Sequence, residues 1–252
     1  MMDHAPALGP VKGLEDPRDT VDKIAKASPS AIMLHGNIFR KTYEYFLQNN
    51  IPFILKLTAT TTLEIIEYPE KSFILTDTLV DDVESAVKLG AVGVAIRASI
   101  GPKIGLDMLK IFKTVTKSCE EWGMPLLAMV YPENVSNPYD PKNVKHAARL
   151  AAELGADIVK TYYTGSKETF SEVIDTCPVP VLMSGGPKTK TPREFLQKVK
   201  DVMEAGAAGV AVGRNVWQAE RPDLMLKAIK LIVIDGKDVE EAEKYLRGEK
   251  GE

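Results

Sequence analysis

The chain has 252 residues, of which 44% are hydrophobic, and it carries a formal net charge of −3 at pH 7. This length and apolar content suit one domain spanning residues 1–252, and the slightly acidic balance argues against nucleic acid or an anionic membrane as a partner. Cys119 and Cys177 form no CxxC pair and no apolar run approaches the roughly 18 residues of a membrane span, so we expect a cytoplasmic protein without disulfides.

Buried, β-branched strands alternate with amphipathic helices along the chain. Strands are expected at residues 31–35, 52–57, 92–97, 125–130, 157–161, 180–183 and 208–212. Helices are expected at residues 16–27, 37–49, 80–89, 104–122, 141–154, 167–175, 192–205 and 222–234. Three joints repeat one pattern, in which a helix ends in Leu-Gly-Ala or Ala-Gly-Ala and a strand follows at once. This pattern is typical of parallel sheets, and the strict alternation predicts a (β/α)8 TIM barrel.

Two segments depart from this pattern. Met1, Met2 and Asp3 would form only the tail of the first barrel strand, which we therefore expect to be truncated at the N-terminus. Residues 59–78 are expected to be an irregular insertion with a short extra strand near residues 73–75.

Lys160 is the most informative residue, because it lies in an apolar, β-branched strand that normally excludes an ammonium group. A lysine buried there is expected to have a lowered pKa and hence some neutral amine, which is the form that attacks a carbonyl to give a Schiff base. The alternative is a core lysine paired with a carboxylate. Alternation along the strand puts Ile158 and Lys160 on one face and Val159 on the other.

Other polar residues are placed at the carboxyl ends of strands, where TIM barrels build their active sites. They are Asp3, His4, His35, Lys56, Arg97 and Tyr131. Lys56 and Lys160 would repel each other as cations in one small cavity, which would lower the pKa of one of them further. Asp3, His4 and His35 could also hold a metal, but two histidines without a third make a poor zinc site, and we expect no metal or other cofactor.

Two glycine-rich turns predict a phosphate site. One is Ser184-Gly185-Gly186-Pro187-Lys188, after the strand at 180–183, and the other is Gly213-Arg214-Asn215, after the strand at 208–212. Glycines let backbone N–H groups approach an anion, arginine adds a bidentate donor, and barrels commonly bind phosphate at these two turns. The alternative is that the glycines only satisfy tight turns. Lys12, Lys188 and Lys190 are candidate phosphate neighbours or simply exposed lysines.

Several motifs together resemble archaeal-type (DhnA-like) class I fructose-bisphosphate aldolase. They are VPVLMSGGPKTKT at 179–191, AVGRNVWQ at 211–218 and ILKL at 54–57. A sister branch, the 2-amino-3,7-dideoxy-D-threo-hept-6-ulosonate synthases, is similar at GPVKGL (9–14), EWGMP (121–125) and GADIVKT (155–161).

This resemblance implies a metal-independent, homo-oligomeric aldolase. Lys160 would form the Schiff base, Tyr131 would transfer protons, and Asp3 would assist together with His4. The substrate phosphate would rest on Gly185, Gly186, Gly213 and Arg214, with Ser184, Lys56 and Lys188 completing the substrate-binding set. The implied reaction is reversible cleavage of fructose 1,6-bisphosphate, as in glycolysis and gluconeogenesis.

Four positions depart from the family. Glu133 and Asn134 follow Tyr-Pro where the family usually has Arg-Gly, Met129 stands where fructose-bisphosphate aldolases often have Trp, and Ala5 replaces a glycine. The first change exchanges an anion-binding guanidinium for a carboxylate and affects the expected site for a second phosphate. This change does not distinguish the two branches, because both usually have the arginine. The alternatives are a synthase-type condensation with aspartate semialdehyde, or a phosphate-binding barrel that forms no imine.

Overall fold

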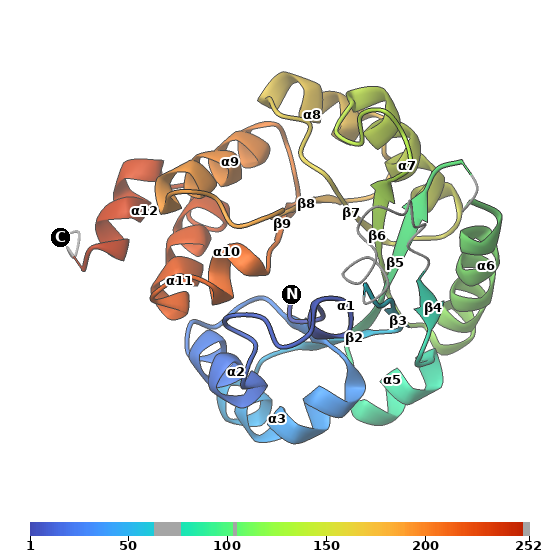
Figure 1. Ribbon diagram of the computed structural model, residues 1–252, viewed down its shortest axis with the longest axis horizontal. Coiled ribbons are helices and arrows are strands. Elements are labelled where there is room, and N and C mark those ends of the chain that lie inside the picture. The colour runs from blue at the N-terminus through green and yellow to red at the C-terminus, as the bar shows by residue number, and fades with distance from the viewer. Residues whose placement is uncertain (63–76, 103–104, 249–252) are drawn as a thin grey trace.

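The computed structural model describes residues 1–62, 77–102 and 105–248. Its main element is a seven-stranded parallel sheet with the strand order β1-β2-β5-β6-β7-β8-β9. The strands are β1 (Ile32–Leu34), β2 (Phe53–Lys56), β5 (Gly93–Ile100), β6 (Leu126–Pro132), β7 (Ile158–Thr161), β8 (Val181–Ser184) and β9 (Gly209–Ala211). The sheet curls around a central axis with the helices outside it (Figure 1), which is the predicted TIM-barrel arrangement.

The predicted helices surround the sheet. They are α2 (Pro17–Ala25), α3 (Gly36–Asn49), α5 (Val83–Leu89), α6 (Gly105–Trp122), α7 (Pro141–Glu153), α8 (Lys167–Asp175), α9 (Pro192–Glu204) and α11 (Pro222–Val233). Several begin with a side chain that accepts a hydrogen bond from the first turn, as Asp140 does from Lys142 N and Thr191 does from Glu194 N. Of the helices that the structure describes, none combines the length and apolarity needed to cross a bilayer.

Short elements that the sequence did not predict complete the fold. They are α1 (Ala5–Leu8), α10 (Arg214–Trp217), α12 (Val239–Leu246), and the antiparallel strands β3 (Thr58–Ala59) and β4 (Thr78–Leu79). The expected extra strand at residues 73–75 lies outside the described residues. Arg97 was predicted to end its strand, but β5 continues to Ile100 because it pairs with β6 as far as Pro132.

The N-terminal residues lie between the two edge strands of the sheet. Met2 N donates a hydrogen bond to Met33 O on β1 at 2.8 Å, and Met1 N donates to Val212 O beyond β9 at 2.8 Å. The indole Nε1 of Trp217 also donates to Met1 O at 3.0 Å. This seam, residues 1–3, takes the place of an eighth strand and brings Asp3 to the carboxyl end of the barrel.

Two apolar layers result from the alternation along each strand. Inside the barrel, Met33, Ala95, Leu127 and Met129 form one buried cluster, against which Ile158 packs. The larger core lies between sheet and helices and contains Val159. The prediction that Ile158 and Val159 face opposite sides is confirmed, so Lys160 shares the inner face of Ile158.

Candidate active site

A cavity of about 340 Å³ lies at the carboxyl ends of the strands. It brings together most of the candidate residues from the sequence, namely Asp3, His4, Lys56, Arg97, Tyr131, Lys160, Ser184, Gly185, Gly186, Gly213 and Arg214. These residues come from both ends of the chain and from its middle, and the barrel topology alone unites them.

Lys160 lies on β7 between Met129 of β6 and Leu182 of β8. Its side chain is buried, and Nζ lies 3.8 Å from the thioether sulfur of Met129. Within the described part of the chain no carboxylate forms an ion pair with Lys160. The structure therefore does not support a core lysine neutralised by an adjacent acid. It presents instead an amine on the wall of a cavity that has room for a small ligand.

Lys56 is the second buried amine, and it donates a hydrogen bond to Thr58 Oγ1 at 2.7 Å. Burial lowers the pKa of Lys56 to about 8, although the negative charges of Asp3 and Asp77 oppose the shift. Repulsion between the two lysines was expected to lower the pKa of one of them; at Lys56 burial is the main cause, and the charge of Lys160 adds to it.

Asp3 faces these amines as a carboxylate. Burial by itself raises the pKa of Asp3, but the close contact with His4 and the positive charges of Lys56 and Lys160 outweigh burial and hold the pKa well below its usual range. The two side chains approach to 3.3 Å, from His4 Nδ1 to Asp3 Oδ1, and the His4 ring packs edge-on against Trp217. Asp3 is therefore ionised near neutral pH, with a negative charge that faces the two amines.

Tyr131 is a buried side chain of β6 whose hydroxyl lies 3.3 Å from Ser184 Oγ. Its ring contacts Tyr162 at a centroid distance of 4.5 Å, and the Arg97 guanidinium carbon lies 5.6 Å from its centre. These contacts fix the ring, so that the hydroxyl is held at one place in the cavity.

The two glycine-rich turns meet at the other side of the cavity. Gly186 has φ +65°, and a Cβ on Gly213 would lie 2.7 Å from the His4 ring, so both positions require glycine. Asn215 joins the turns, because its Nδ2 donates to Gly185 O at 2.9 Å and its Oδ1 accepts from Thr189 N at 2.9 Å. Sequence reasoning gave Asn215 no role, although it lies within the turn motif.

Arg214 is the charged group of this pair of turns. Its Nε is buried without a hydrogen-bond partner, and within the described ranges it forms no ion pair with a carboxylate. A buried donor without a partner is costly, so a site with this arrangement is suited to an anionic ligand.

Three of the lysines and one histidine are not part of the cavity. Lys188 is exposed, does not line the cavity, and donates from Nζ to Gln218 O at 2.6 Å. Lys12 and Lys190 are exposed as well. His35 precedes α3 and does not line the cavity.

Arg97, on β5, forms an ion-pair cluster that sequence reasoning missed. Its two terminal nitrogens donate to Asp77 Oδ2 and Glu133 Oε1, and Ser99 Oγ donates to Glu133 Oε2 at 2.5 Å. Asp77 lines the cavity and contributes a carboxylate to its surface. The only early signal was Glu133, which departs from the arginine that the sequence resemblance implies.

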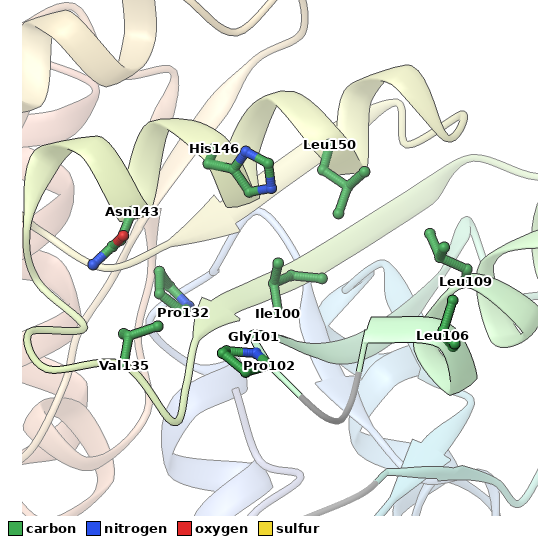
Figure 2. A pocket seen from close by; sticks show the side chains of 10 residues that line it. All are labelled: Ile100, Gly101, Pro102, Leu106, Leu109, Pro132, Val135, Asn143, His146 and Leu150. Carbon is green, nitrogen blue, oxygen red and sulfur yellow. The ribbon is translucent and has the colours of Figure 1, made fainter.

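A larger hollow lies outside the barrel. It has a volume of about 570 Å³ and is bordered mainly by apolar side chains between α6 and α7, including Ile100, Leu106, Leu109 and Leu150 (Figure 2). His146 of α7 also borders it. This hollow contains none of the converging polar groups, so its size does not make it the functional site. In the part of the chain that the structure describes, no three His, Cys, Asp or Glu side chains are grouped as metal ligands.

Replacing Lys56 with methionine is expected to change how stability depends on pH. Below pH 8, Lys56 is charged in both the folded and the unfolded state, and burying that charge destabilises the folded state. Between pH 8 and 10.5 the folded state loses the proton while the unfolded state keeps it, so the parent protein gains stability as pH rises. The stability advantage of Lys56→Met at pH 7 should therefore shrink by about 3 kcal/mol by pH 10.5.

Urea unfolding at several pH values from 7 to 10.5 measures this difference. Lys117→Met is the matched control, because that side chain is 75% exposed on α6. Its stability difference from the parent should change little over the same range. A pH-independent difference for Lys56→Met would contradict the assigned shift.

Comparison with known proteins agrees with this geometry. Residues 1–219 match the family described as DeoC/LacD family aldolase. The chain is 36% identical to an uncharacterized aldolase of Saccharolobus solfataricus, over 98% of this chain and 92% of that protein. It is 34% identical to 2-amino-3,7-dideoxy-D-threo-hept-6-ulosonate synthase 1 of Archaeoglobus fulgidus, over 97% of this chain and 88% of that protein.

A solved structure is similar over most of the barrel. It is an archaeal fructose-1,6-bisphosphate aldolase whose catalytic Lys is covalently bound to the carbinolamine intermediate of its substrate. It is 34% identical, with a TM-score of 0.83, and the match covers 92% of this chain and 91% of that chain. The family match and these relatives agree with the sequence resemblance, and the chain belongs to the DeoC/LacD family of aldolases.

Proposed function

We propose that the protein is a class I aldolase that forms a Schiff base between Lys160 and a phosphorylated ketose. The observation that carries this proposal is the buried Lys160 amine, which faces a cavity and has no ion-pair partner among the described residues. An amine without a counter-ion in an apolar wall is suited to nucleophilic attack on a carbonyl.

The phosphate of the ketose would be bound by Gly185, Gly186, Gly213 and Arg214. Binding of the phosphate would hold the substrate carbonyl next to the Lys160 amine. The attack would then occur within one complex, without the entropic cost of bringing two molecules together. The amine attacks the carbonyl carbon to give a carbinolamine, and loss of water leaves an iminium. Asp3 takes the proton of the hydroxyl on the aldehyde side, and the electrons of the breaking C–C bond flow into the iminium to form an enamine.

Tyr131 would then protonate the enamine carbon, and water would hydrolyse the resulting iminium to release the ketose fragment and restore the amine. The position of the Tyr131 hydroxyl, 3.3 Å from Ser184 at the edge of the phosphate turns, supports this role. Lys56 would act through its charge on Lys160 and Asp3.

Two substrate assignments agree with this chemistry. The resemblance to archaeal fructose-bisphosphate aldolases supports cleavage of fructose 1,6-bisphosphate to dihydroxyacetone phosphate and glyceraldehyde 3-phosphate. The identity to the synthase of Archaeoglobus fulgidus supports a condensation of the synthase type, with aspartate semialdehyde as the aldehyde.

Borohydride trapping tests the proposal. Dihydroxyacetone phosphate with borohydride should leave a stable adduct, and peptide mapping should place it on Lys160. Dihydroxyacetone, which lacks the phosphate, is the matched control and should require a much higher concentration for the same labelling. Absence of a substrate-dependent adduct would defeat the proposal and favour a phosphate-binding barrel that forms no imine.

A further inference from the structure

The hydroxyl group of Thr58 occupies a break in the sheet, just beyond the end of β2. In a regular parallel ladder Arg97 N of β5 would donate to Leu57 O. That carbonyl instead accepts hydrogen bonds from Val80 N at 2.9 Å and Asp81 N at 3.3 Å. Arg97 N donates to Thr58 Oγ1 at 2.8 Å, so a side-chain hydroxyl replaces a backbone carbonyl as the acceptor.

The same hydroxyl accepts a second hydrogen bond, from Lys56 Nζ at 2.7 Å. A threonine hydroxyl has two acceptor positions and one proton. Because Arg97 N and Lys56 Nζ fill both acceptor positions, the hydroxyl can only donate in any further contact. Among the residues that the structure describes, none accepts its proton in a hydrogen bond. Thr58 is buried but borders the cavity, so a bound ligand can supply the acceptor.

The strand register places this hydroxyl at the level of the proposed nucleophile. Arg97 pairs with Met129 on β6, and Met129 pairs with Lys160 on β7. Thr58 Oγ1 is bonded to the backbone of Arg97 and therefore lies at the same height in the barrel. Lys56, Thr58 and Lys160 all line the one cavity.

The proposed chemistry needs a proton donor at this place. Attack by the Lys160 amine gives a carbinolamine, whose hydroxyl group leaves easily only as water and so needs a proton. Asp3 is ionised and has no proton to give. The Lys56 ammonium does carry protons, and the contact from its Nζ to the Thr58 oxygen connects it to a hydroxyl that can only donate.

We propose that Thr58 is a catalytic residue that passes a proton from Lys56 to the hydroxyl group leaving the carbinolamine. This inference rests on the proposed imine at Lys160 and deepens it. The nitrogen lone pair of Lys160 forms the C=N bond as the C–O bond breaks. The leaving oxygen takes the Thr58 proton and departs as water, while the Thr58 oxygen takes a proton from the Lys56 ammonium. Hydrolysis of the iminium runs the same steps in reverse.

Electrostatics favours this route. The transfer turns Lys56 into a neutral amine at the moment when the Lys160 nitrogen becomes a cationic iminium, so the number of buried cations stays the same. Without the transfer, two cations would face each other in a small cavity. Burial lowers the pKa of Lys56 to about 8, so the ammonium form predominates at pH 7 but loses its proton more readily than an ordinary lysine.

Thr58→Val and Thr58→Ser form the matched pair of variants, because valine keeps the branched shape without the hydroxyl and serine keeps the hydroxyl. The readout is the rate at which a reducible adduct on Lys160 appears after rapid mixing with dihydroxyacetone phosphate and a timed borohydride quench. Thr58→Val should slow this rate by about 10²-fold, and Thr58→Ser should stay close to the parent rate. Thr42→Val is the control, because it removes a buried hydroxyl that bonds to Ile38 O within α3.

Lys56→Met distinguishes proton transfer from an effect of charge or of structure. If Lys56 acted only through its charge, its removal would speed formation of the iminium, because one opposing cation is lost. Loss of the proton donor should instead slow it, by a factor similar to that of Thr58→Val. The double variant should be no slower than the slower single variant, because both residues serve one transfer. Losses that multiply would assign separate structural roles and overturn the inference.

The proposed imine and the proposed transfer fail in different ways. Absence of any adduct in the parent protein defeats the imine at Lys160, and the transfer with it. The parent rate in Thr58→Val, or a faster adduct in Lys56→Met, overturns only the transfer. Lys56→Met decides the question if Thr58→Val does not fold.

Discussion

Lys160→Met is expected to lower kcat for ketose cleavage by roughly 10⁴-fold or more, because no other group would form the covalent intermediate. Methionine has a similar length and is apolar, so it suits the buried position beside Met129. The fold should therefore survive while the reaction is lost. Steady-state cleavage assays measure the loss, and circular dichroism verifies the fold.

Lys56→Met separates the two buried amines. It should retain a borohydride adduct on Lys160 with reduced turnover, because the nucleophile is still present. If Lys160→Met stayed active and Lys56→Met lost the adduct, the nucleophile would be Lys56 and the assignment of Lys160 would be wrong.

Tyr131→Phe is expected to lower kcat by about 10² to 10⁴-fold, the usual contribution of a positioned acid or base. Phenylalanine keeps the ring that packs on Tyr162 and removes only the hydroxyl near Ser184. Solvent deuterium exchange into dihydroxyacetone phosphate isolates protonation of the enamine carbon. It should slow in parallel with cleavage, whereas trapping of the imine should be less affected.

Tyr163→Phe is the control for the loss of a phenol. Its hydroxyl lies 3.4 Å from Asp201 and its ring packs on Phe170, outside the cavity. This variant should keep kcat near the parent value. Exchange at the parent rate in Tyr131→Phe would assign the proton transfer to another group.

The positions of the strands and of most catalytic candidates were predictable because they depend on local pattern. Alternation around Lys160 sets its direction, and a buried run followed by glycines locates the turns at Gly185 and Gly213. The expectation that Asp3 joins Lys160 depended on barrel closure, which is a property of the whole topology rather than of local sequence.

The Arg97 cluster could not be predicted in this way. Asp77 and Glu133 are 20 and 36 residues from Arg97 in sequence, and no short motif connects them. The direction of the Lys188 side chain could not be predicted for a different reason. Lys188 lies in a turn, and the backbone direction there decides whether its side chain faces the cavity or the Gln218 carbonyl. The local sequence does not specify that direction.

The seam formed by residues 1–3 ties proton transfer to the integrity of the barrel. Asp3 reaches the cavity only while Met2 stays bonded to Met33 and Met1 to Trp217. Fraying at this one join, which leaves every strand pair of the sheet intact, would withdraw the Asp3 carboxylate, the proposed proton acceptor, from the cavity. On warming, turnover should therefore decline before the helices melt, with Lys160, the proposed Schiff-base residue, still in place.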